Sequence, residues 1–209
     1  MLNFDQNNFM KDLLIKRFQY YKSLGDQTFT QLSEEQMFWK YNEESNSIAV
    51  IVKHITGNML SRWTNFMTED GEKEWRNRDE EFINVLMTKS EILESWEKGW
   101  DCLFGALDQI NEENIHATVY IRGEAHSVLD AILRQLAHYP YHIGQIIYIA
   151  KMVKNEDWNT LSIARNKSKA FNAKMKSKFS EDSLAENSSP VCYHNSPEVR
   201  DDFQDETRH

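Results

Sequence analysis

The sequence predicts an all-α protein, built as a four-helix bundle over residues 1–160 and followed by a polar C-terminal tail over residues 161–209. Four stretches of the chain carry apolar residues at intervals of three and four, the spacing of an amphipathic helix. Capping residues or a helix-ending glycine stand at the ends of these stretches. Only residues 114–122 read as extended, so helices are expected to form the core.

The first two helices are predicted from their apolar spacing and from the residues at their ends. Gly25 is placed to end the first helix. The second begins with a β-branched run, but its apolar pattern continues to Phe66, which is too long for a typical strand. One helical turn after Ser33 is expected between them. The candidate N-caps are Asn3 or Asp5 for the first helix and Ser45 or Ser47 for the second.

The third and fourth helices follow a long, charged loop over residues 68–87. Thr88 with Glu91 three residues later forms a capping-box pattern, which predicts the start of the third helix. A turn at Gly123 then precedes the fourth helix, predicted over residues 125–154.

The apolar pattern stops after Trp158. Residues 165–178 read as a basic linker, and residues 180–209 lack an apolar face, so the tail is predicted to be disordered. This tail carries −6 of the formal net charge of −9, which leaves the body only slightly acidic. Such a body lacks the basic surface that dominates nucleic-acid affinity, so we expect no nucleic-acid partner.

Two cysteines are too few for a disulfide framework, which favours a reducing compartment. The N-terminal residues lack the pattern of a signal peptide, and no apolar run has the length of a membrane span. We therefore expect a cytoplasmic protein with no membrane partner.

His138 and His142 lie one turn apart in the fourth predicted helix. Residues four apart share a helix face, with Cβ atoms about 5–6 Å apart, so two imidazoles at this spacing can bind one metal ion. Pro140 lies between them and is expected to kink or widen this turn. The alternative is that both rings only form hydrogen bonds to neighbouring helices.

A third ligand must come from another part of the chain. The zincin motif is excluded, because it requires glutamate directly after the first histidine and Tyr139 stands there. His126 is twelve residues before His138, or about 18 Å along the helix, so it is too far away. His54, in the apolar part of the second helix, is the candidate. Three histidines on one face leave open positions, as in catalytic metal sites.

These residues resemble the DinB-like (damage-inducible) metal-binding superfamily. The resembling stretches are SNSIAVIVKHITGNMLSRW and RQLAHYPYHIGQIIYIAK, and TEDGEKEWRNRDEEF between them is similar to an uncharacterised subfamily. The resemblance covers residues 4–172 and implies a bundle of up-down-down-up topology. It also implies that His54, His138 and His142 bind one divalent metal ion.

The resemblance further implies a metal-dependent enzyme, either a thiol transferase or a hydrolase, in which the metal activates a low-molecular-weight thiol or water. The expected cofactor is a divalent metal ion, zinc first, with nickel, manganese or iron as alternatives. The expected partner is a small-molecule substrate, and a homodimer is compatible with this interpretation. The sequence assigns no catalytic side chain.

Other polar residues have two interpretations each. Gln145 and Asn58 share the helix faces of the histidines, so they either orient the imidazoles or are ordinary polar residues between helices. Arg134 and Arg122 either bind a substrate carboxylate or solvate the surface. The loop over residues 68–87 either covers the site or simply connects two helices.

Two classes of protein compete with the enzyme. One is a non-catalytic, metal-stabilised helical bundle that acts as a dimeric binding or stress-related protein. The other is a metal-free bundle for protein interaction. Turnover and metal content after purification distinguish the three.

Overall fold

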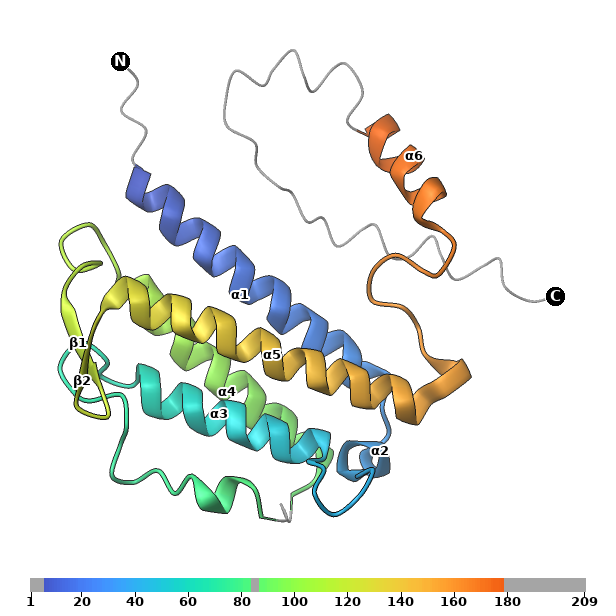
Figure 1. The fold of residues 1–209 in the computed structure, drawn as a ribbon, viewed down its shortest axis with the longest axis horizontal. Coiled ribbons are helices and arrows are strands. Elements are labelled where there is room, and N and C mark those ends of the chain that lie inside the picture. Colours follow the sequence, from blue (N-terminus) through green and yellow to red (C-terminus); the bar gives the residue numbers. More distant parts are fainter. Residues whose placement is uncertain (1–5, 84–86, 179–209) are drawn as a thin grey trace. The chain divides into compact units, whose positions relative to one another are not determined.

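The computed structural model describes residues 6–83 and 87–178, and this part of the chain is mostly helical (Figure 1). The chain divides into two units, one ending at Leu161 and the other beginning at Ser162. None of the described helices is both long and apolar enough to cross a membrane. The elements in order are α1 (Gln6–Thr30), α2 (Glu34–Phe38), α3 (Ile48–Trp63), η1 (Asp79–Glu81), α4 (Lys89–Asp108), β1 (Thr118–Ile121), β2 (Glu124–Ser127), α5 (Val128–Lys154), η2 (Asn155–Asp157) and α6 (Ser168–Lys178).

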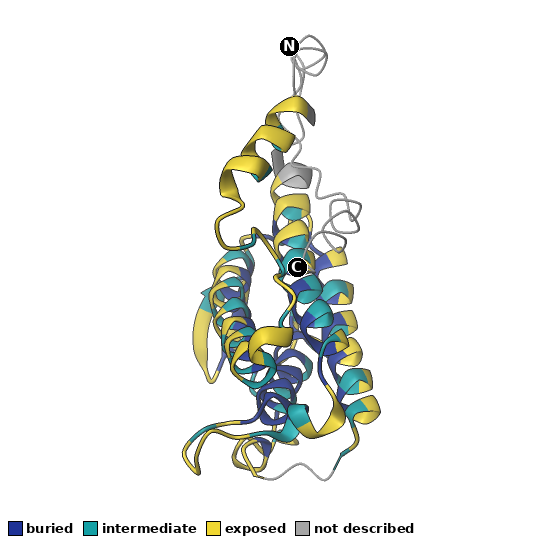
Figure 2. Cartoon of the chain, turned by 90° about the vertical axis from the view of Figure 1, so that its right-hand side faces the viewer, coloured by how far each residue is buried: buried dark blue, intermediate teal, exposed yellow. Residues whose placement is uncertain are grey.

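Four long helices of the first unit, α1, α3, α4 and α5, lie side by side (Figure 1). The helix α3 packs along α4 and also against α5, and α1 packs along α5. Their facing sides carry the buried residues and their outer sides are exposed (Figure 2). The predicted helical core is therefore confirmed.

Large aromatic side chains fill the centre of this core. Trp96, Trp100 and Tyr139 are among its fully buried residues, and the two indole rings meet edge to face with centroids 5.3 Å apart. The buried phenol of Tyr139 accepts a hydrogen bond from Trp63 Nε1 (3.1 Å) and donates one to Asn58 Oδ1 (3.0 Å). The hydroxyl is thus satisfied where no water reaches it, which keeps α3 and α5 in register.

The first helix runs past its predicted end. We expected Gly25 to terminate it, but α1 continues to Thr30. Gly25 is required for close packing instead, because a Cβ atom there would lie 2.6 Å from the indole of Trp96. The next residue, Asp26, accepts the hydrogen bond of that indole (2.7 Å).

The predicted helix starts are confirmed where a capping side chain marks them. Ser47 accepts a hydrogen bond from the backbone of Val50 and begins α3, and Ser33 and Thr88 form capping boxes at α2 and α4. The helix α3 ends three residues before the predicted Phe66. Asn65 adopts a left-handed conformation (φ 49°) that stops it.

The described chain also contains one small sheet, because β1 and β2 form an antiparallel hairpin, and β1 lies within residues 114–122 that were expected to be extended. Arg122 and Gly123 make its turn with φ of 56° and 76°. The carboxylate of Asp70 accepts both of their backbone N–H groups at 2.8 and 2.7 Å. Residues 124–127 belong to β2, so α5 begins at Val128 instead of residue 125.

The second unit contains α6 (Ser168–Lys178), within the segment predicted as a linker. Its lysines and alanines favour helix, which accounts for this element locally. Residues 180–209, predicted to form a disordered tail, lie outside the described residues.

Candidate metal centre

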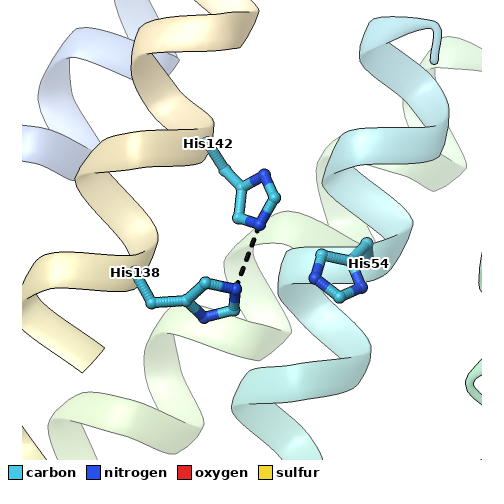
Figure 3. A group of neighbouring side chains, drawn as sticks. All are labelled: His54, His138 and His142. Carbon is cyan, nitrogen blue, oxygen red and sulfur yellow. Dashed lines mark hydrogen bonds between the residues drawn. The ribbon is translucent and has the colours of Figure 1, made fainter. Parts of the chain in front are cut away.

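The three predicted histidines lie together between α3 and α5 (Figure 3). His54 projects from α3 and is buried, whereas His138 and His142 project from α5 and are half-buried. Their rings are 4.7–5.6 Å apart between centroids, and one ligand nitrogen from each lies within 4.8 Å of the others. We call these three residues the histidine cluster.

Each imidazole of the cluster has a side-chain oxygen beside its Nδ1 atom. His54 Nδ1 lies 2.9 Å from Glu81 Oε2. On α5, His138 Nδ1 lies 3.2 Å from Gln135 Oε1, and His142 Nδ1 lies 2.9 Å from Gln145 Oε1. Since these oxygens are acceptors, they favour the tautomer with the proton on Nδ1. The lone pair of each ring is then on Nε2.

The Nε2 atoms of His138 and His142 face each other at 3.0 Å (Figure 3). If both rings carry their proton on Nδ1, two lone pairs meet at this distance and repel. A cation between the two atoms removes the repulsion. Without a cation, one ring must move its proton to Nε2 and its glutamine must turn its amide to donate.

A buried ion pair holds the oxygen partner of His54. Glu81, only 5 % exposed, accepts hydrogen bonds from Arg76 Nε at 2.7 Å and Nη2 at 2.9 Å. Burial alone would raise the pKa of Glu81, but the hydrogen bonds from His54 and Arg76 outweigh it and lower that pKa. The carboxylate of Glu81 is therefore ionised, and its negative charge favours the binding of a cation by the histidine cluster.

The segment around η1 covers His54. Phe82 lies beside the imidazole with ring centroids 4.9 Å apart, and the guanidinium carbon of Arg78 lies 5.6 Å from the centroid of the Phe82 ring. Lys53 donates to the carbonyl oxygen of Glu80 (2.6 Å) and fastens the segment to α3. Part of the predicted loop over residues 68–87 therefore covers the cluster.

Two imidazoles of the cluster are held in the neutral form. Burial, together with the charges of His142 and His54, lowers the pKa of His138 to about 3. Burial also lowers the pKa of His142, against the opposing effect of the hydrogen bond that its Nδ1 donates to Gln145. Neutral imidazole is the form that binds metal ions, so the folded protein presents these ligands ready to bind.

Other predicted residues lie outside the cluster or have other partners. His126 is in β2 and its Nδ1 contacts Asp130 at 2.6 Å. Asn58 binds the phenol of Tyr139 instead of an imidazole. Arg122 forms an ion pair with Glu72 at 3.1 Å. Gln145 alone takes the orienting position predicted for it.

Sequence reasoning missed Gln135 and Glu81. Gln135 stands three residues before His138, the same interval that separates His142 from Gln145, so helical spacing could have identified it. Glu81 follows no regular spacing, because it lies 27 residues from His54 in an irregular segment with several other acids. Only the folded chain identifies it as the partner of His54.

A cavity of about 390 Å³ lies elsewhere, between the start of α1 and the end of α4, and no histidine of the cluster lines it. Its lining includes Met10, Leu14, Leu107 and Ile115. Its volume is larger than a metal ion requires, but it has no converging nitrogen ligands. We therefore place the candidate site at the histidine cluster, where ligand chemistry converges.

The fold and the site define a class of protein: a mostly helical protein with a three-histidine cluster between two of its long helices. The chain belongs to the family described as "Protein of unknown function (DUF1572)", whose model matches residues 5–167. A comparison with curated proteins found no match. The matched residues contain the entire histidine cluster.

Proposed function

We propose that the protein is a metal-dependent enzyme of the DinB-like superfamily, a thiol transferase or hydrolase. In this proposal α1, α3, α4 and α5 form the four-helix bundle of up-down-down-up topology that the sequence resemblance implies. The histidine cluster holds one divalent ion through three Nε2 atoms. The observation that carries the proposal is the side-chain oxygen beside each Nδ1, since this pattern directs three lone pairs to one place.

The spacing of the nitrogens fits such an ion. Two imidazole nitrogens bonded to one ion at about 2.0–2.1 Å lie about 2.9–3.4 Å apart, for bond angles between square and tetrahedral. The 3.0 Å between His138 and His142 is within this range. His54, within 4.8 Å, completes the set with a shift of its ring of at most about 2 Å.

Zinc is the first candidate because of its availability, followed by nickel, manganese and iron, since an open three-imidazole site suits each of them. A divalent ion there supplies Lewis acidity, which lowers the pKa of a bound thiol or water toward neutrality. Glu81, Gln135 and Gln145 orient the three ligands, and Phe82 keeps water from the buried side of His54.

The buried phenol of Tyr139 is not assigned a proton-transfer role. Burial raises its pKa, and its hydroxyl already donates to Asn58. The bound thiol or water is therefore the proposed nucleophile, with no nucleophile from the chain itself. The partner is a small molecule in the cytoplasm, and the enzyme acts as a monomer or homodimer without nucleic acid or membrane.

Elemental analysis of the purified full chain, followed by thiol-transfer and ester-hydrolysis assays, tests this function. We expect about one divalent ion per chain and a metal-dependent rate. Alanine at His54, His138 or His142 should abolish both, whereas alanine at the exposed His116 or at His126 should change neither. Retention of full metal content by His54→Ala would refute the site.

A non-catalytic bundle stabilised by metal predicts a different set of results. In that case the metal raises the melting temperature and occupies the same three residues, but no thiol or activated ester reacts. A metal-free interaction protein predicts no bound ion and no gain in melting temperature with zinc or nickel.

A further inference from the structure

Two rows of side chains face each other between α3 and α5. On α3, His54, Asn58 and Arg62 follow at intervals of four, and on α5 the same interval joins Arg134 to His138 and His142. The two helices run in opposite directions (Figure 1), and the histidines face one another across them (Figure 3). Beyond the histidines, Arg62 of α3 lies near enough to Arg134 of α5 for the two charges to interact. One end of this interface therefore carries imidazoles and the other end carries two guanidinium groups.

Two of the three guanidinium nitrogens of Arg62 are buried without a hydrogen-bond partner in the part of the chain that the structure describes. Arg62 is 5 % exposed, and neither its Nε nor its Nη1 atom has an acceptor among the described residues. The backbone of Gly71 closes over the group, since a Cβ atom there would lie 2.5 Å from Arg62 Nη1. A buried, unpaired cation is costly, and it normally indicates a missing anion or water.

The nearby acids are bound to other groups. Glu72 pairs with Arg122 and Arg76, and Asp70 accepts the backbone N–H groups of the hairpin turn. Glu69 pairs with Lys73 and Glu81 with Arg76. Within residues 6–83 and 87–178, no carboxylate lies at ion-pair distance from Arg62 or Arg134.

Several charged groups act on the buried Arg62. Burial lowers the pKa of Arg62, and the charges of Arg134 and Arg76 lower it further, whereas Tyr139 and Glu72 oppose the shift. The exposed Arg134 and the half-buried His138 bring this region to the surface on the α5 side.

We propose that Arg62 and the exposed Arg134 form a carboxylate-binding subsite beside the histidine cluster. The substrate or thiol of this enzyme is then a small molecule that carries a carboxylate. This inference rests on the proposed function, because it takes the histidine cluster as the reacting centre. The carboxylate supplies the hydrogen-bond acceptors that Nε and Nη1 of Arg62 lack among the described residues. The reactive group of the same molecule reaches the cluster, whose His54 is eight residues, or about 12 Å of helix, away.

The test uses linear dicarboxylates as probes, namely succinate, adipate and suberate, with neutral adipamide and inorganic phosphate for comparison. Binding to the full chain is measured by calorimetry, with metal content measured on the same samples. The variants are Arg62→Met, Arg62→Lys, Arg134→Gln and, as a control, Arg17→Met, an exposed arginine of α1. Metal-free protein is prepared with 1,10-phenanthroline, a chelator without carboxylates.

We expect at least one dicarboxylate to bind the wild-type protein and the control, and adipamide not to bind. Arg62→Met should weaken this binding about tenfold or more, because a charge-assisted hydrogen bond is lost, and Arg62→Lys should restore part of it. Arg134→Gln should weaken it less. Metal content should be unchanged in all four variants, and the melting temperature of Arg62→Met should be equal to or above that of the wild type.

Equal binding by Arg62→Met and wild type overturns the subsite. So does a preference for phosphate over every dicarboxylate, or a lower melting temperature for Arg62→Met with carboxylate binding intact, which would make Arg62 a structural residue bonded to water. The proposed function fails separately. If the chain holds no metal but the Arg62-dependent binding persists, the subsite stands and the metal centre does not.

Discussion

The tautomers of three imidazoles decide what the histidine cluster can bind. Glu81 sets the tautomer of His54 by accepting from its Nδ1, and no other acceptor contacts that atom among the described residues. Replacing Glu81 by glutamine retains the shape but removes the charge. We expect metal affinity to fall about 10–100-fold, as for other partners of metal-binding histidines. Competition with a chelator measures it, with Glu80→Gln, the adjacent exposed acid, as the control.

The side chains of Arg76 and Arg62 are both buried, but among the described residues only Arg76 has a carboxylate partner. Arg76→Met leaves Glu81 charged and largely uncompensated in the core, so it should lower the free energy of unfolding by about 3–5 kcal/mol. Arg62→Met removes a charge that has no partner and should cause no such loss. Urea denaturation of metal-free protein compares them. Equal destabilisation by both variants would show that Arg62 also has a structural partner.

The lowered pKa of His138 predicts how stability depends on pH. The unfolded residue binds a proton near pH 6.5, whereas the folded one does so only near pH 3. Between these values the unfolded chain holds more protons, so the metal-free protein should lose stability as pH falls from about 6.5 toward 3. Urea midpoints measured across this range test the slope. His138→Gln should flatten it, and His116→Gln, at an exposed site, should not.

Among the secondary-structure elements, the helix starts that depend on neighbouring residues could be predicted from the sequence. The caps at Ser47 and Thr88 depend on side-chain and backbone groups within three residues, so the sequence predicted the start at Thr88 and offered Ser47 as one of two candidates. The hairpin was only half recognised. β2 is short and continues directly into α5, and its pairing with β1 is stabilised by Asp70 from a distant loop. A pattern read along the chain cannot contain that contact.

Gly25 was misinterpreted for a similar reason, and its packing role can be tested. Gly25→Ala should destabilise the protein by about 1–3 kcal/mol, because the new methyl group meets the indole of Trp96. Gly105 is the matched control, since it lies inside α4 with no atom near its missing Cβ. Gly105→Ala should stabilise by about 0.5–1 kcal/mol. Thermal unfolding shows whether each variant is more or less stable than the wild type. If both variants are less stable, backbone effects of the substitution dominate over packing.

Across the whole molecule, the candidate site depends on how two long helices are paired. The interval between His138 and His142 was visible in the sequence, as was the apolar setting of His54. Their convergence required α3 to pack against α5 in one register, which the bond from Tyr139 to Asn58 helps to fix. The sequence therefore predicted the three residues, while Glu81 and the unpaired Arg62 emerged only from the folded chain.

An anomalous difference map from crystals of the full chain, loaded with zinc or nickel, tests most directly whether the three histidines hold one ion. We expect one peak per chain, with Nε2 of His54, His138 and His142 at about 2.0–2.1 Å from it. A peak that excludes His54, coordination through Nδ1, or no peak with either metal would contradict the proposed site.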